Sequence, residues 1–257
     1  MAGQLARIID RWRLRKVQEY WTRTGDAAPT MRPLALHSLR SQARAMRRQI
    51  DRVIHAADHR LSAPAIGAGL PRQPLGTDWT WRADAWRGPL PLPGLIASSD
   101  RSRISDDLSL YHDCPLGEVA VRQVRNTGED DREPFGLGIE VFGFSGSFLS
   151  LATTLPPEAV QGLKSRHLLR LDAMIVAERH LRAYARLNVK HGPNVAQLVR
   201  EIPSLAGEVV VDFDLAYAKI DDTRIEKAWL DLIFNDAAMN GVSVRDLVVS
   251  RRPRAEL

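Results

Sequence analysis

Cysteine is nearly absent from this sequence of 257 residues, in which Cys114 is the only one. An internal disulfide is therefore excluded, which is typical of proteins kept in a reducing compartment. The chain also lacks any run of about 20 apolar residues, the length that a membrane-spanning helix needs. Charged residues interrupt every apolar stretch between Met1 and Arg23, unlike the apolar core of a secretion signal. We therefore expect a cytoplasmic protein.

Lysine is scarce as well, with five among the 36 basic residues. The net charge of +5 is unevenly spread, because residues 1–60 hold 13 basic and 5 acidic residues and the remainder holds 23 and 26. The basic character belongs to the N-terminal segment, where electrostatic association with an anionic membrane surface is to be sought. Nucleic-acid binding is not favoured, since the excess of arginine over lysine is interpreted mainly as a general bias in amino-acid composition.

Motifs for cofactors and catalysis are missing. The sequence contains no glycine-rich phosphate loop and no G-x-S-x-G nucleophile turn. His55 and His59 are one helical turn apart, but no third metal ligand is in view. The acidic turns 129–131 and 221–222 lack the spacing of a calcium loop. We therefore predict no cofactor, no metal and no catalytic residue; Cys114 is interpreted as structural.

Two basic amphipathic helices are predicted in residues 1–62. The first has apolar residues at helical spacing, including Trp12, Tyr20 and Trp21, and the second follows Pro33. The apolar residues of the second helix recur at alternating intervals of three and four from Leu36 to Ala57, as in a coiled coil. The favoured interpretation is an αα-hairpin whose apolar stripes cover each other or the rest of the protein. Contact with another chain or with a membrane surface is the alternative.

Residues 63–104 are rich in proline and glycine and are predicted to be a connector. The segment contains Trp79, Trp81 and Trp86, half of the tryptophans in the chain. Because an indole is costly to leave in water, we expect the connector to lie across the following domain with these side chains buried. An aromatic ligand platform is the less favoured interpretation.

Residues 105–257 are predicted to form an antiparallel β-sandwich of the jelly-roll kind. Turn signals such as Asn240-Gly241 separate short segments of alternating apolar and polar residues. Segments 157–163 and 194–201 are interpreted as short helices. The fold class is thus mainly β with a helical N-terminal extension, and the nine predicted strands are 107–111, 119–125, 137–144, 148–153, 167–176, 181–190, 209–217, 227–234 and 242–250.

Alternation divides each predicted strand into an inward and an outward face. The outward residues combine aromatic, amide and charged side chains. They form either cross-strand ion pairs on a solvated face, which is the expected form of a half-buried sheet, or a polar groove that stacks and hydrogen-bonds a saccharide. The candidate ligand-binding residues are Tyr184, Arg186, Asn188, Asp212, Asp214, Trp229 and Asp231.

Four segments carry a resemblance to a known family: 184–194 (YARLNVKHGPN), 212–217 (DFDLAY), 227–234 (KAWLDLIF) and 250–257 (SRRPRAEL). With GTDW at 76–79 and WRGP at 86–89, they resemble an uncharacterised alphaproteobacterial family of unknown function, over nearly the whole chain. The family has no assigned activity, so the resemblance implies no mechanism. The C-terminal part also looks like a jelly roll of the carbohydrate-binding-module type, which is a likeness of architecture alone.

Three functional hypotheses follow. The leading one is a non-enzymatic binding or structural protein, with the sandwich face as a saccharide or partner surface. The alternative is a peripheral scaffold that docks to a membrane or partner through its basic N-terminal helices. The third is a hydrolase on a jelly-roll frame, which requires paired carboxylates about 5–10 Å apart in a cleft. Oligomeric state is left open.

Overall fold

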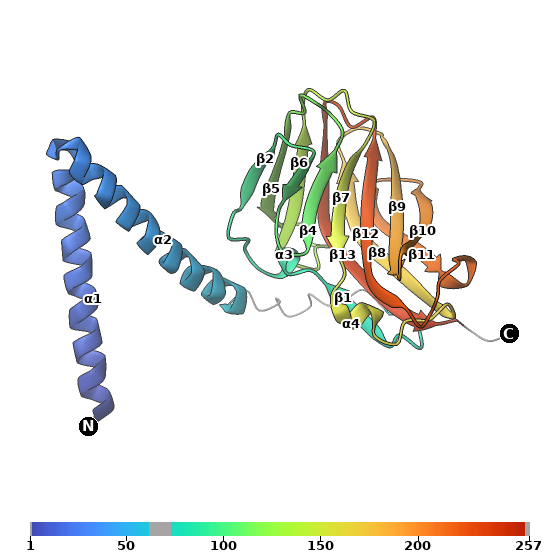
Figure 1. Ribbon diagram of the computed structural model, residues 1–257, viewed down its shortest axis with the longest axis horizontal. Coiled ribbons are helices and arrows are strands. Elements are labelled where there is room, and N and C mark those ends of the chain that lie inside the picture. Colours follow the sequence, from blue (N-terminus) through green and yellow to red (C-terminus); the bar gives the residue numbers. More distant parts are fainter. Residues whose placement is uncertain (1, 62–72, 255–257) are drawn as a thin grey trace. The chain divides into compact units, whose positions relative to one another are not determined.

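The computed structural model describes residues 2–61 and 73–254 (Figure 1). The chain divides into two compact units, residues 1–54 and 55–257. The first unit is helical and the second holds both β-sheets. The elements of the first unit are α1 (Ala2–Ala27), the 3₁₀ turn η1 (Ala28–Thr30) and α2 (Pro33–Leu61), which continues into the second unit.

The two N-terminal helices are confirmed, with Pro33 at the first position of α2, where its missing N–H leaves no helical hydrogen bond unmade. Within the first unit α1 and α2 do not cover each other's apolar stripes completely, since Trp12 is 61% exposed, Ile50 51% and Val53 69%. Within the described residues, neither helix combines the length and the hydropathy needed to cross a membrane.

Seven strands of the described chain form one antiparallel sheet, which we call sheet A. Six lie in the order β11-β8-β13-β6-β5-β2, and β1 pairs with β13 beside this path. The strands of sheet A are β1 (Trp79–Arg82), β2 (Gly94–Ala97), β5 (Val119–Arg125), β6 (Phe135–Val141), β8 (His167–Ala177), β11 (Ala206–Asp214) and β13 (Asn240–Pro253).

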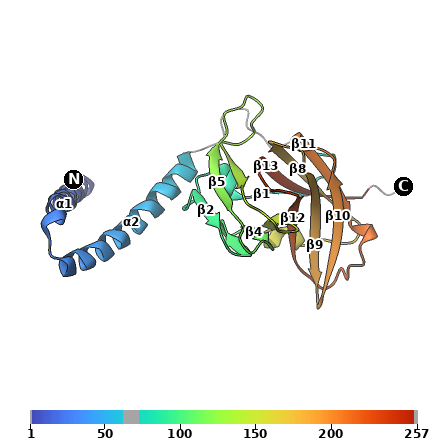
Figure 2. The ribbon, with the colours of Figure 1, turned by 90° about the horizontal axis from the view of Figure 1, so that it is seen from above.

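Six further strands form sheet B, in the order β10-β9-β12-β7-β4-β3. Figure 2 shows the two layers, with β8, β11 and β13 on one side and β9, β10 and β12 on the other. The predicted antiparallel sandwich is therefore confirmed. The strands of sheet B are β3 (Arg101–Arg103), β4 (Leu108–His112), β7 (Leu149–Thr154), β9 (Arg182–His191), β10 (Asn194–Ile202) and β12 (Ile225–Asn235).

The core lies between the sheets and follows the alternation of the strands. Leu187 on β9, Leu232 on β12 and Leu171 on β8 are each at most 1% exposed, as are Phe213 and Phe234. Burial of these apolar side chains supplies the main stabilisation of the fold. Side chains at the intervening positions point away from the core, so every strand of sheet B presents a second, outer face.

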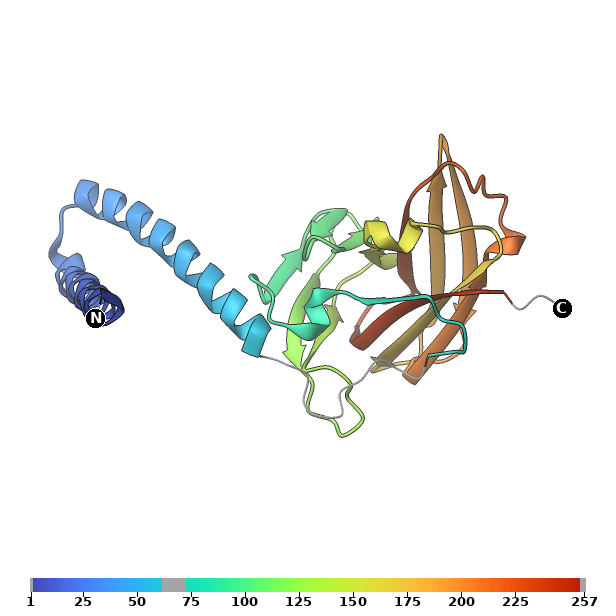
Figure 3. The same cartoon turned by 90° about the horizontal axis from the view of Figure 1, so that it is seen from below.

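The sandwich begins earlier than predicted. Residues 79–103 contribute β1, β2 and β3, so part of the predicted connector belongs to the two sheets, and residues 62–72 lie outside the described range. Trp86, on the short helix α3 (Asp84–Arg87), is fully buried as expected, and its indole N–H donates to the carbonyl of Val244 at 3.0 Å. Figure 3 shows the turquoise segment with β1 and α3 crossing one end of the sandwich.

A second difference concerns segment 194–201, which was predicted to be helical and is the edge strand β10. The spacing of Val195, Leu198 and Ile202 imitates a helical stripe. In the strand, Leu198 and Ile202 are buried, while Val195 on the opposite face is 43% exposed. The turn at Gly192, whose φ of 56° favours glycine, reverses the chain into a hairpin with β9. Segment 157–163 is helical only at its start, in α4 (Pro157–Val160).

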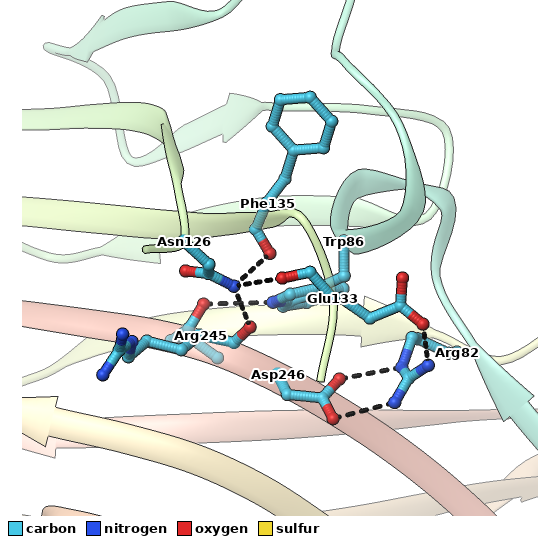
Figure 4. A network of polar contacts seen from close by, with 8 residues as sticks. Arg82, Trp86, Asn126, Glu133, Phe135, Arg245 and Asp246 are labelled. Atoms are coloured by element: carbon cyan, nitrogen blue, oxygen red, sulfur yellow. Dashed lines mark hydrogen bonds and ion pairs between the residues drawn. The ribbon is translucent and has the colours of Figure 1, made fainter. Parts of the chain in front are cut away.

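A buried ionic network links β1 to β13 and to the segment before β6 (Figure 4). The Arg82 guanidinium donates to both carboxylate oxygens of Asp246 at 2.8 and 2.9 Å and also pairs with Glu133. The Asn126 amide joins this region by donating to three backbone carbonyls, including that of Glu133 at 2.9 Å. Burial raises the pKa of Glu133. We call Arg82, Glu133 and Asp246 the clasp.

Candidate functional site

A groove of about 670 Å³ lies on the outer face of sheet B. Its walls come from β3, β4, β7, β9 and β12, which are neighbours in the sheet, and from the β3–β4 turn and the residue before β7. We call this feature the groove. It is lined by Arg101, Arg103, Asp106, Ser109, Tyr111, Phe148, Ser150, Ala152, Thr154, Arg186, Lys227, Trp229 and Asp231.

Strand register brings together residues that are far apart in the sequence. Asp231 on β12 stands opposite Arg186 on β9 and Ala152 on β7, and Ala152 in turn stands opposite Ser109 on β4. Because alternate residues share a face, this row is continuous across the groove. Ala152 and Ser109 in this row have small side chains. They leave space above the sheet beside the larger side chains of Asp231 and Arg186.

Asp231 is the centre of a hydrogen-bond network at one wall of the groove. Its carboxylate accepts from Arg186 Nε at 2.9 Å and from Asn188 Nδ2 at 2.8 Å. The Asn188 carbonyl oxygen accepts from Gln197 Nε2 at 3.1 Å. Asp231 is 4% exposed and Asn188 fully buried, so both are held in one orientation beneath the arginine. The network fixes a guanidinium at the groove surface.

Two aromatic side chains, Tyr111 and Trp229, stand at diagonal positions of the groove. Trp229 shares a row with Thr154, whereas Tyr111 shares a row with Ser150 and Ile233. Both rings are half-buried and thus keep part of their surface open. Two strand spacings and four residues along β12 separate the two positions, which amounts to roughly 16 Å between their Cα atoms.

Each of these rings has a cation beside it. Lys227 Nζ lies 5.4 Å from the centre of the Trp229 ring, and Arg101 Cζ lies 5.6 Å from the centre of the Tyr111 ring. Attraction between a cation and the π-face holds such a side chain near the ring. Among the residues whose side chains the structure describes, neither cation has an ion-pair partner. Both charges are therefore available at the groove surface.

The floor of the groove carries an unsatisfied hydroxyl. Ser150 is 3% exposed, and its Oγ has no hydrogen-bond partner among the described residues. A buried polar group without a partner costs about 1–3 kcal/mol. Since Ser150 lines the groove, a ligand hydroxyl or a water molecule there would supply the missing partner.

The predicted site residues divide between the two sheets. Arg186, Trp229 and Asp231 line the groove, Asn188 supports Asp231 from below, and Tyr184 lies on the same face of β9 but outside the groove lining. Asp212 and Asp214 lie on β11 of sheet A, so the expectation that all seven residues share one surface is wrong. Alternation assigns a residue to the outer face of its own strand but does not say to which sheet that strand belongs.

The two aspartates of β11 are engaged in ion pairs. Arg170 donates to both oxygens of Asp212 at 2.9 and 2.7 Å, and this hydrogen bonding lowers the pKa of Asp212. Asp214 accepts from the backbone N–H of Ala216 at 3.0 Å and lies 3.6 Å from Arg254. The cross-strand ion-pair interpretation is therefore the one observed for Asp212, whereas the partner of Asp214 follows β13 rather than lying on a neighbouring strand.

Sequence reasoning missed the half of the groove contributed by β3, β4 and β7. Alternation in Leu108–His112 and Leu149–Thr154 already places Tyr111 and Ser150 opposite the apolar residues of their strands, so a signal for these two existed. Arg101 and Arg103 lie in the segment interpreted as a connector, where no strand was expected. Lys227 was included in a predicted strand but was not assigned to a face.

The other candidate motifs are explained by local structure. Asp131 accepts from the backbone N–H of Gly128 at 2.7 Å and also pairs with Arg245, while Asp221 accepts from the Thr223 hydroxyl at 2.7 Å. Both acidic segments thus stabilise their own turns. His55 and His59 lie outside the residues whose side chains the structure describes.

Comparison with solved structures finds similar architectures. The family 11 carbohydrate-binding module from Clostridium thermocellum, in complex with a beta-1,3-1,4-mixed-linked tetrasaccharide, matches with a TM-score of 0.39 and 12% identity over 60% of this chain and 92% of that chain. The enzymatically active domain of tailspike protein 4 of bacteriophage CBA120 matches with a TM-score of 0.40 and 9% identity over 60% of this chain and 21% of that chain. An exo-beta-agarase matches with a TM-score of 0.38 and 13% identity over 63% of this chain and 25% of that chain.

This chain thus spans about a fifth of the length of the tailspike chain and most of the length of the binding module. No curated protein sequence matches it. A family model, in contrast, matches residues 1–257 throughout. The chain belongs to the family of unknown function DUF6478.

Proposed function

We propose that the protein binds a saccharide in the groove of sheet B without transforming it. The carrying observation is the combination of two half-open aromatic rings, Tyr111 and Trp229, with the unpartnered hydroxyl of Ser150 between them on the groove floor. The C–H faces of a sugar ring pack on aromatic rings, and its hydroxyl groups satisfy polar atoms that protein contacts leave open.

The spacing of the rings favours an extended ligand. Their separation of roughly 16 Å along a diagonal of the sheet exceeds the size of one pyranose ring. An oligosaccharide that reaches from one ring to the other would pass over the small side chains of Ser109 and Ala152 and beside Arg186. We therefore propose binding to a chain of several sugar units rather than to a monosaccharide.

The carboxylates support binding rather than hydrolysis. A glycosidase needs two carboxyl groups about 5–10 Å apart at the scissile bond. Asp231 is hydrogen-bonded to Arg186 and Asn188, while Asp212 and Asp214 are paired on the other sheet. The remaining acidic side chain of the groove, Asp106, is 96% exposed and pairs with Arg103. The predicted hydrolase is accordingly not our proposal.

The test is a glycan array probed with the labelled full chain, followed by titration of the best ligand. We expect binding that falls about tenfold or more in Trp229→Ala and Tyr111→Ala, which remove the stacking surfaces. Tyr217→Ala is the matched control, because Tyr217 is 76% exposed and lies outside the groove. Absence of binding to every glycan, or equal losses in all three variants, would contradict the proposal.

A second candidate function concerns the N-terminal helices and is favoured by their exposed apolar side chains. Trp12 and Tyr20 are 61% and 53% exposed on α1, and Met46 is 40% exposed on α2. Together with the excess of arginine in residues 1–60, these side chains match a helix that lies on an anionic membrane surface. This role would localise the protein at a membrane.

Sedimentation of the full chain with vesicles tests this role. We expect co-sedimentation with phosphatidylglycerol vesicles but not with phosphatidylcholine vesicles, and weakening as salt increases. Trp12→Ser should reduce it, whereas Trp229→Ala should not. Equal sedimentation with both lipids, or none with either, would exclude the membrane role.

A further inference from the structure

The groove is positively charged, although the sandwich as a whole has more acidic than basic residues. Residues 61–257 contain 23 basic and 26 acidic residues, so this part of the chain is slightly acidic. Around the groove, however, four cationic and two anionic side chains form the lining. Cations thus exceed anions by two at the surface where a ligand would lie.

The two anionic side chains are already engaged. Asp231 interacts with Arg186 Nη2 at 2.8 Å, and Asp106 interacts with Arg103 Nη2 at 2.5 Å. The two remaining cations are Arg101 and Lys227, which have no ion-pair partner in the described parts of the chain. Their neighbours are aromatic rings, which attract a cation but do not neutralise it.

The positions of these cations coincide with the expected stacking surfaces. Lys227 lies over Trp229 on β12, and Arg101 lies over Tyr111 where β3 meets β4. A neutral sugar that packed on either ring would compete with the cation for the ring face. A sugar with an acidic substituent would instead accept hydrogen bonds from the cation while its ring packs beside it.

We infer that the groove selects an acidic saccharide, one that carries carboxylate or sulfate groups, through Arg101 and Lys227. The inference rests on the proposed saccharide-binding function and names its ligand class. The two charges flank the aromatic pair, so acidic groups on separate sugar units would be contacted together. Ser150, on β7 between β12 and β3, contacts an intervening unit, and Arg186 on β9 lies beside the path of the ligand.

An array that pairs acidic glycans with neutral counterparts tests the inference. It carries galacturonate, glucuronate and sialylated oligosaccharides, sulfated oligosaccharides, and the corresponding neutral or desulfated chains. We expect the full chain to bind acidic members at least tenfold more tightly than their counterparts, with an advantage that shrinks as salt increases. The uronate and sulfate arms decide which acidic group is preferred.

Two double variants locate the selectivity. Arg101→Gln/Lys227→Gln should abolish the preference for acidic members, because it removes the two unpaired charges and leaves the aromatic rings in place. Arg40→Gln/Arg44→Gln is the matched control, since it removes two charges from the basic helix α2, which offers a competing surface for polyanions. This control should retain the preference.

The possible results of these binding experiments lead to different conclusions. Binding only to neutral glycans, lost in Trp229→Ala, would overturn the acidic selectivity and leave saccharide binding intact. A preference that persists in the groove variant and disappears in the helix variant would overturn the inference by assigning the charge effect to α2. Absence of binding to every member would overturn both the selectivity and the proposed function.

Discussion

On the outer face of sheet A, Arg170 holds both oxygens of Asp212 and Arg82 holds both oxygens of Asp246. On the outer face of sheet B, Arg101 and Lys227 have aromatic rings beside them and no ion-pair partner among the described residues. These two arginines of sheet A are thus engaged in bidentate pairs with carboxylates, whereas these two cations of sheet B keep their charges available to a ligand.

The comparison distinguishes the polar groups of the sandwich that stabilise the fold from those that are available to bind a ligand. A bidentate ion pair across neighbouring strands satisfies its members and leaves little for a ligand to bind. Unpaired cations, half-open rings and the unpartnered Ser150 hydroxyl have interactions still to make. The first arrangement is expected of a structural face and the second of a binding face.

The largest expected effect is on the clasp. Arg82→Ala should lower the free energy of unfolding by about 3–5 kcal/mol, because it leaves Asp246 and Glu133 buried without their counter-ion. Urea denaturation measures the change. Arg182→Ala is the control, since Arg182 and Asp236 form a solvent-exposed pair whose loss should change the free energy of unfolding far less. Equal losses in both variants would contradict the structural role assigned to the clasp.

A smaller change in the unfolding free energy is expected when one carboxylate on each face is neutralised. Asp231→Asn should cost about 2 kcal/mol by weakening its charged hydrogen bonds, and should also reduce glycan binding because Arg186 loses its anchor. Asp212→Asn should cost about 1 kcal/mol or less and leave binding unchanged. Denaturation and glycan titration are measured on both variants. A loss of binding in Asp212→Asn would remove the distinction between the faces.

On sheet A, Asp172 is an exception to the paired carboxylates, and the pH dependence of the unfolding free energy tests its role. Burial raises the pKa of this carboxyl, whose Oδ2 has no partner among the described residues. Its neutral form therefore stabilises the fold at pH values below the ordinary carboxyl pKa, and this stability is lost as pH rises through the raised pKa.

Asp172→Asn should accordingly raise the unfolding free energy at pH 7 by about 1 kcal/mol, and the gain should vanish in acid. Urea denaturation across the pH range measures this. Asp212→Asn has the opposite sign at pH 7, because hydrogen bonds from Arg170 lower the pKa of Asp212. A gain for Asp172→Asn that does not change with pH would contradict the burial argument.

The smallest expected effect is at Ser150. Ser150→Ala should increase stability by up to about 1 kcal/mol, because it removes a buried hydroxyl without a partner, and should weaken glycan binding. Thr153→Val is the matched control: Thr153 is also buried with an unpartnered hydroxyl but faces the core. The control should share the gain in stability and leave binding unchanged. Equal binding by both variants would remove Ser150 from the site.

Much of the fold could be predicted from alternation and turn residues. The strand 119–125 was predicted with its observed limits, and Leu181–Lys190 differs from β9 by one residue at each end. The edge strand β10 could not be predicted in this way, because an apolar spacing of three and four fits a helix as well as an exposed strand. Its hairpin with β9 decided the outcome.

For the candidate site, the sequence by itself determined which side chains point away from the core, and this holds for Trp229 and Asp231. Only the tertiary structure decided that these residues face Tyr111 and Ser150, while Asp212 belongs to the other sheet. The physical reason is that a strand's alternation depends on its own residues, whereas its neighbours depend on hydrogen bonding and burial across the whole sandwich. The groove therefore exists only through the pairing of β12 with β7 and β9.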